Sequence, residues 1–174
     1  MMTLGNNYQA YQNNEKFGYV FQYPRNTLQL NRGINPYTHR PVFSEVGLLT
    51  GLAESDWSWT PLVTDFDNDG LRDVIITNGF PQDITDQDFM VYRAEVGAYV
   101  APVQLLDLIP SVKVKNKAYR NKGNLQFEEV TESWGITEPS FSNGAAYADL
   151  DNDGDVDVLI ANNNGPVRLL LNEN

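Results

Sequence analysis

The sequence predicts an all-β fold assembled from short strands, in the form of a sandwich, a barrel or a propeller. Three observations lead to this prediction: a globular composition, an internal repeat, and short β-branched segments separated by Gly, Asn and Asp. The chain has 174 residues, of which 41% are hydrophobic and 11% aromatic. It is therefore long enough to bury a hydrophobic core without disulfides or an obligatory metal.

The internal repeat is clearest in two acidic segments. DFDNDGLRDVIITN begins at Asp65, and DLDNDGDVDVLIANN begins at Asp149. The same offset aligns Phe43, Glu45, Val46, Gly51, Glu54 and Ser58 with Phe127, Glu129, Val130, Gly135, Glu138 and Ser142. Because the matches extend far upstream of the acidic segments, the repeat is a structural unit and not a chance similarity of two loops.

The repeat divides the chain into segments. Residues 28–80 form the first repeat and residues 118–166 the second, each with a strand, a glycine turn, a second strand, and an acidic loop between two further strands. Residues 167–174 resemble the opening of both repeats and are expected to begin another one. Residues 1–27, which are rich in Asn, Gln and Tyr, either are the remnant of a preceding blade or have no clear assignment.

Residues 81–117 interrupt the repeats and are expected to form a short helical insertion. The segment ITDQDFMVYRAEV has apolar residues at helical spacing after a possible N-cap at Thr85 or Asp86. In APVQLLDLIP, Pro102 suits the first turn of a second helix.

Composition and charge exclude several functional classes. The 12 basic and 23 acidic residues give a formal net charge of −11, which argues against nucleic acid or an anionic membrane surface as a partner. The absence of Cys excludes thiol catalysis, disulfides and thiolate zinc sites. No apolar run is long enough for insertion into a membrane, and the first residues lack the pattern of a signal peptide.

The two acidic loops are the strongest functional signal. Each has the pattern DxDxDGxxD: Asp65, Asp67, Asp69 and Asp73 in the first loop, and Asp149, Asp151, Asp153 and Asp157 in the second. Two carboxylates at 4 Å repel by about 4 kcal/mol at an effective dielectric constant of 20, so a cation is expected to hold such a loop together. Oxygen ligands at alternate positions and a glycine turn favour calcium, with the carbonyls of Leu71 and Asp155 as further ligands.

These loops are not EF-hands. An EF-hand needs a Glu at the twelfth position and flanking helices, whereas Ile76 and Ile160 occupy that position within apolar strands. The ninth-position aspartates are expected to close the two sites instead, and the side chain of Asp155 is expected to point outward. The alternative interpretation is a pair of solvated acidic turns, because Asp, Asn and Gly are ordinary turn residues.

Aromatic residues near the loops allow two interpretations. Trp57, Trp59, Trp134 and Tyr147 are able to line a carbohydrate or peptide site, or to pack in the core. Trp57 aligns with Phe141 across the repeat, which favours packing.

The segments DFDNDGLRDVIITNG, YRNKGNLQFEEVTESWGI and YADLDNDGDVDVLIANN resemble FG-GAP/VCBS repeats, the blades of integrin-α-like β-propellers. Their order, over about residues 25–174, resembles secreted VCBS-repeat proteins of Bacteroidetes-type bacteria that often carry an ASPIC/UnbV region. The resemblance implies a partial propeller of about two blades from a seven-bladed ring, with one Ca²⁺ in each loop. It also implies an extracellular or bacterial cell-surface location.

The function expected from these features is a non-enzymatic, calcium-binding propeller module that binds a protein or a glycan. The alternatives are an accessory, non-catalytic part of a carbohydrate-active enzyme and a purely structural scaffold. Two repeats cannot close a propeller, so the sequence is expected to be a segment of a longer chain. Its partners are then neighbouring blades, or other copies that associate through the open sheet edges.

Overall fold

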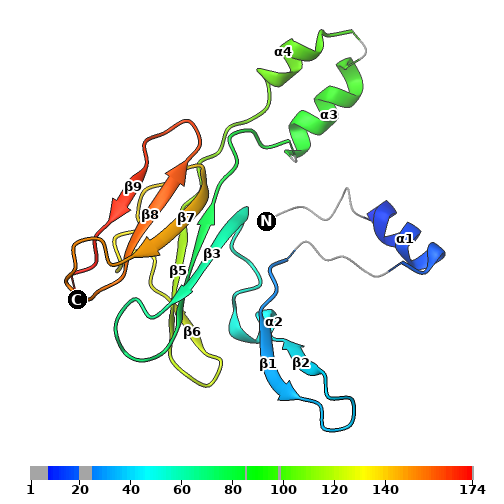
Figure 1. Cartoon of the computed structure of the whole chain (residues 1–174). Coiled ribbons are helices and arrows are strands. Elements are labelled where there is room, and N and C mark those ends of the chain that lie inside the picture. Colours follow the sequence, from blue (N-terminus) through cyan, green and yellow to red (C-terminus); the bar gives the residue numbers. More distant parts are fainter. Residues whose placement is uncertain (1–7, 20–24, 85, 98, 174) are drawn as a thin grey trace. The chain divides into compact units, whose positions relative to one another are not determined.

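A computed structural model describes residues 8–19, 25–84, 86–97 and 99–173 (Figure 1). These residues form two compact units. One is drawn from the ranges 1–25 and 82–112, and the other from the ranges 26–81 and 113–174. The first unit is helical, and the second contains all the strands of the described chain.

The helical unit contains α1 (Tyr8–Phe17), α3 (Gln87–Val96) and α4 (Pro102–Leu106). The expected insertion therefore contains two helices. Asp86 caps α3, since its side chain accepts a hydrogen bond from the Phe89 N–H at 2.8 Å, whereas Thr85 lies outside the described residues. None of the described helices combines the length and the apolar character needed to cross a membrane.

The second unit consists of three antiparallel sheets (Figure 1). The first sheet pairs β1 (Gln29–Ile34) with β2 (Pro41–Glu45), and the short helix α2 (Gly47–Thr50) follows it. The second has the order β3 (Ser58–Thr64), β4 (Asp73–Asn78), β5 (Lys117–Asn121) and β6 (Phe127–Glu129). The third has the order β7 (Ser142–Ala148), β8 (Asp157–Asn162) and β9 (Arg168–Leu170).

The sheets and the sequence repeats have different borders. The first repeat supplies β1 and β2 to one sheet and β3 and β4 to the next, and β5 and β6 of the second repeat complete that four-stranded sheet. Residues 168–170 belong to the sheet of β7 and β8 in the same way. The helical insertion stands where a hairpin turn would join β4 to β5, whose register places Ile75 opposite Ala118. Strand pairing therefore links consecutive repeats.

The strand β4 is buried along its whole length because the hydrophobic core lies on both of its faces. On one face, Ile75 packs in a cluster with Ile160 and Val158 of the third sheet. On the other face, Val74 and Ile76 pack in a second cluster. The second cluster also contains Leu52 and Tyr119, with Leu28 and Phe127 against it. This double burial explains why residues 74–76 of β4, VII, are a continuous apolar run with no polar alternation.

The predicted all-β class is confirmed. The described chain is mostly sheet with a few short helices, and no sheet closes into a barrel within it. Packing of one sheet against the next through apolar faces is the arrangement that a propeller fragment requires.

The aromatic residues singled out in the sequence make packing contacts. Trp57 stacks on Phe80 with ring centroids 4.9 Å apart, and the Trp59 indole donates a hydrogen bond to the Gly79 carbonyl at 2.7 Å. Trp134 and Tyr147 both approach Phe66 edge to face. Phe66 is buried in the first loop. Tyr147 belongs to β7 and Trp134 lies between β6 and β7, so the two rings pack the loop against the third sheet and against the segment that precedes it.

We predict that Ile160→Ala lowers the free energy of unfolding by about 2–5 kcal/mol, because Ile160 is buried between two sheets. Leu159→Ala is the matched control, since Leu159 is the preceding residue of β8 and is 42% exposed. It should change stability by less than about 1 kcal/mol. Urea denaturation of the two variants measures both values, and equal losses would contradict the assigned facing of β8.

Candidate metal centre

The two acidic loops occupy equivalent places in the fold. The first joins β3 to β4, where Thr64 pairs with Asp73, and the second joins β7 to β8, where Ala148 pairs with Asp157. Each loop has an asparagine and a glycine at positive φ: Asn68 (58°), Gly70 (88°), Asn152 (62°) and Gly154 (101°). Asparagine and glycine tolerate this backbone region best, so NDG produces the same sharp turn in both loops.

The first carboxylate of each loop accepts hydrogen bonds from the backbone of the turn. Asp65 accepts the N–H groups of Asp69 and Gly70 at 3.1 and 2.9 Å, and Asp149 accepts that of Gly154 at 3.2 Å. These bonds hold the chain in a ring around its own acidic side chains, which supports the predicted local conformation.

Three carboxylates converge in each loop. In the first loop, Asp65, Asp67 and Asp73 each offer an oxygen atom, and these atoms lie within 4.8 Å of one another. In the second loop the same holds for Asp149, Asp151 and Asp153. The structure thus brings together six of the predicted ligands, whereas Asp69 and Asp157 lie outside the two groups of three. The Asp69 carboxylate accepts the N–H of Leu71 at 2.8 Å.

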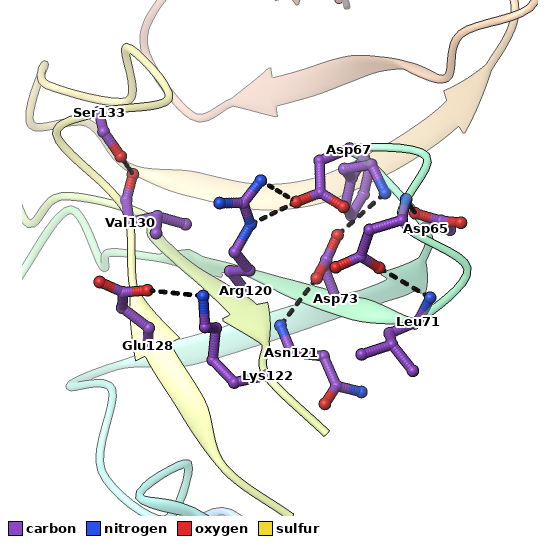
Figure 2. A network of polar contacts seen from close by, with 12 residues as sticks. Asp65, Asp67, Leu71, Asp73, Arg120, Asn121, Lys122, Glu128, Val130 and Ser133 are labelled. Carbon is purple, nitrogen blue, oxygen red and sulfur yellow. Dashed lines mark hydrogen bonds and ion pairs between the residues drawn. The ribbon is translucent and has the colours of Figure 1, made fainter.

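The ninth-position aspartates connect each loop to a later part of the chain, and Figure 2 shows this for Asp73 and Asn121. Both are fully buried. Asp73 accepts the N–H of Phe66 at 3.0 Å and that of Asn121, in β5, at 2.8 Å. Asp157 accepts the equivalent pair from Leu150 and Asn172, both at 2.9 Å. Two backbone donors stabilise each buried carboxylate, so these residues shape the fold whether or not a metal is bound.

Arg120, in β5, places a positively charged side chain beside the first loop. Its Nε and Nη2 atoms both contact Oδ2 of Asp67, whose side chain is only 4% exposed (Figure 2). The other oxygen of that carboxylate, Oδ1, is buried and has no hydrogen-bond partner. A buried carboxylate oxygen without a donor suits a cation as its partner.

The predicted outward orientation of Asp155 is wrong. The side chain is 6% exposed, and its Oδ1 accepts a hydrogen bond from Nδ2 of Asn68 at 2.5 Å. Asn68 belongs to the first acidic loop, so the two loops lie side by side and Asp155 bridges them. The sequence could not show this contact because it joins residues 87 positions apart.

Sequence analysis also missed Asn121 and Asn172 as components of the site. Asn121 is the last residue of β5, and Asn172 lies just after β9. Their side-chain amides donate hydrogen bonds to backbone carbonyls of the first loop, Asn121 to that of Arg72 at 2.9 Å and Asn172 to that of Phe66 at 2.6 Å. The signal was present in the sequence, because asparagine recurs at this position as Asn31, Asn121 and Asn172.

Burial and neighbouring acidic groups raise the pKa of one aspartate in each loop. Burial raises the pKa of Asp73 above its ordinary value, although the N–H donors of Asn121 and Phe66 act in the opposite direction. Desolvation and the charges of Asp153 and Asp157 raise the pKa of Asp151. In both loops, a proton or another cation is therefore favoured beside the carboxylates.

A cavity of about 350 Å³ lies beside the first loop, between the second and third sheets. Asp67, Arg120 and Trp134 line it together with apolar residues of β4, β8 and β9. Its volume is within the range of small-molecule sites.

Known proteins resemble part of this chain. Residues 105–160 match the FG-GAP-like repeat family. This stretch contains β5, β6, β7 and the whole second acidic loop, but it does not contain the first loop. The FG-GAP-like resemblance stated from the sequence is thus supported over the second repeat.

Two vertebrate proteins are similar over a stretch of comparable length. Cartilage acidic protein 1 of Mus musculus is 40% identical over 57 residues, which are 32% of this chain and 9% of the mouse protein. Cartilage acidic protein 1 of Xenopus tropicalis is 38% identical over 60 residues, which are 34% of this chain and 9% of the frog protein. The matched stretch is a small part of each relative.

We predict that Asp157→Ala destabilises the calcium-free chain by about 1–3 kcal/mol for each backbone N–H that it leaves without a partner. Asp151→Ala in the same loop is the matched control. Asp151 is exposed and repelled by neighbouring acids, so its removal should leave the calcium-free chain equally stable or more stable. Denaturation in EDTA measures both, and an equal loss in the two variants would contradict the structural role of Asp157.

Proposed function

We propose that this chain is a non-enzymatic, calcium-binding module of a β-propeller that presents its loops to a protein or glycan outside the cell. The observation that carries the proposal is the convergence of three carboxylates in each of two equivalent loops. The second loop lies within the FG-GAP-like match, and the first repeats its sequence pattern and its local turn.

Calcium is the ion that the donor set favours. Asp65, Asp67 and Asp73 would hold one ion, and Asp149, Asp151 and Asp153 the other. All of these donors are oxygen atoms, which favour hard cations, and the irregular loop geometry suits calcium better than magnesium. A bound ion would neutralise repulsion that otherwise opposes the closed loop, so its role here is structural.

The proposal that the module is non-enzymatic rests on what the carboxylates do. Asp73 and Asp157 accept two backbone hydrogen bonds each, and Asp67 is held by Arg120. These groups serve the loop's own structure, and no pair of them stands as a free acid and base across a cleft, as glycoside hydrolysis requires.

The proposal also includes a binding partner and a location outside the cell. The relatives are named for cartilage, which agrees with a location outside cells, where calcium is abundant enough to fill weak sites. The cavity lined by Trp134 and Arg120 is a place where a sugar ring or a protein side chain could be received. The edge strands β6 and β9 would meet neighbouring blades or a second copy of the chain.

We predict that calcium raises the melting temperature of the chain by several degrees over EDTA, whereas magnesium has a much smaller effect. Binding to the folded state alone stabilises by roughly 2.7 kcal/mol per site when calcium is a hundred times its Kd. Thermal unfolding of one dialysed sample in EDTA, in calcium and in magnesium measures the shift.

Two variants serve as controls for this experiment. The first removes charge from the loops but keeps a hydrogen-bond acceptor for each turn. Asp65→Asn combined with Asp149→Asn should abolish most of the calcium effect, because each substitution removes the charge of one ligand. The single carbonyl oxygen of each asparagine still accepts a backbone N–H of the turn, although Asp65 accepts two, one on each carboxylate oxygen. Asp88→Asn, in α3 of the helical unit, removes an exposed charge that belongs to neither loop and should leave the effect intact. A calcium shift that survives in the double variant would contradict the proposed sites.

We also predict that the calcium effect grows as pH rises through the folded-state pKa values of Asp73 and Asp151. Both pKa values lie above the ordinary aspartate value. The calcium-free chain therefore loses the stability contributed by these protonated groups as pH rises through that interval, while calcium binding gains ionised ligands. Melting temperatures with calcium and with EDTA, measured between about pH 4 and pH 7, test this, and a calcium shift independent of pH would contradict it.

A further inference from the structure

The two acidic loops differ in the residue that precedes the asparagine bound to the ninth-position aspartate. Arg120 precedes Asn121, which binds Asp73 of the first loop, and Leu171 precedes Asn172, which binds Asp157 of the second. The positions are structurally equivalent because the two asparagines make the same backbone contact. One loop therefore has a guanidinium at a place where the other has an apolar side chain.

The guanidinium of Arg120 is part of the first loop's charge balance. Two of its nitrogen atoms contact one oxygen of Asp67, a buried carboxylate at the third position of the motif. A guanidinium is charged at any ordinary pH. The first loop thus has a permanent positive charge beside its converging carboxylates.

The second loop has no such charge. Among the residues that the structure describes, no lysine or arginine forms an ion pair with Asp149, Asp151, Asp153 or Asp157. Leu171 is 53% exposed and carries no charge. The three carboxylates that converge in this loop, those of Asp149, Asp151 and Asp153, therefore have no cationic side chain paired with them in the described chain.

We propose that Arg120 is a built-in cation that makes the two sites unequal, so that the second loop is the high-affinity calcium site and the first binds calcium more weakly. This inference rests on the proposed function. Arg120 repels a divalent ion at the first loop and occupies Oδ2 of Asp67. Because Oδ1 of Asp67 has no hydrogen-bond partner, calcium binding there is weakened and not abolished.

Isothermal titration of calcium into single-site variants of the full chain tests this inequality. Asp149→Asn with Asp151→Asn leaves the first site, and Asp65→Asn with Asp67→Asn leaves the second. The second site should bind calcium at least about tenfold more tightly than the first. Far-ultraviolet circular dichroism in EDTA checks that both variants are folded.

Substitution of Arg120 then tests whether this residue causes the difference in calcium affinity between the two sites. Arg120→Leu, added to the variant that retains the first site, should tighten calcium binding by about tenfold, and it should lower the melting temperature in EDTA. If Arg120→Leu does not fold without calcium, Arg120→Gln removes the charge and keeps a polar side chain at Asp67. The reciprocal change, Leu171→Arg, should weaken the second site.

The outcomes separate this inference from the proposed function. Equal affinities at the two sites, or weaker binding after both Arg120 substitutions, overturn the inference and leave calcium binding intact. An absence of calcium binding in the wild-type chain overturns the proposed function and the inference with it.

Discussion

The rest of this structure depends on the burial of a carboxylate at the base of each acidic loop. Asp73 and Asp157 are completely removed from solvent, and each accepts one N–H from its own loop. The second N–H comes from Asn121 at the end of β5 for Asp73, and from Asn172, just after β9, for Asp157. A buried charge without such donors is costly, so the carboxylate, the loop and the strand must come together at once. This requirement fixes where the loop begins, where β4 and β8 start, and where β5 and β9 join the sheets.

The same constraint makes the fold continuous across the repeats. If the strands of one repeat paired only with one another, its ninth-position aspartate would lack the second N–H donor. For Asp73 that donor is Asn121 of β5, which belongs to the second repeat. The four-stranded sheet of β3 to β6 therefore contains parts of both repeats. Asp73 also belongs to the converging carboxylates of the first loop, so one residue links strand pairing to the proposed metal site.

Two further contacts make the acidic loops unequal and connected. Arg120 neutralises part of the charge in the first loop, and Asn68 of that loop binds the buried Asp155 of the second. Tandem copies of one motif have thus acquired different surroundings, because each packs against a different neighbour. The sequence pattern alone describes the two loops as equivalent, whereas their electrostatics are not.

The sequence by itself determined the all-β class, the two loops and their turn, because these depend on alternation, β-branched runs and the conformational freedom of Asn and Gly over a few adjacent residues. It also indicated the helices of the insertion, for which the capping Asp86 is a local signal. Only the tertiary structure decided which carboxylates converge, that Asp155 turns inward, and that Arg120 and Asn172 belong to the loops. These features depend on strands far apart in the chain being brought side by side, and on which side chains burial then forces to find partners.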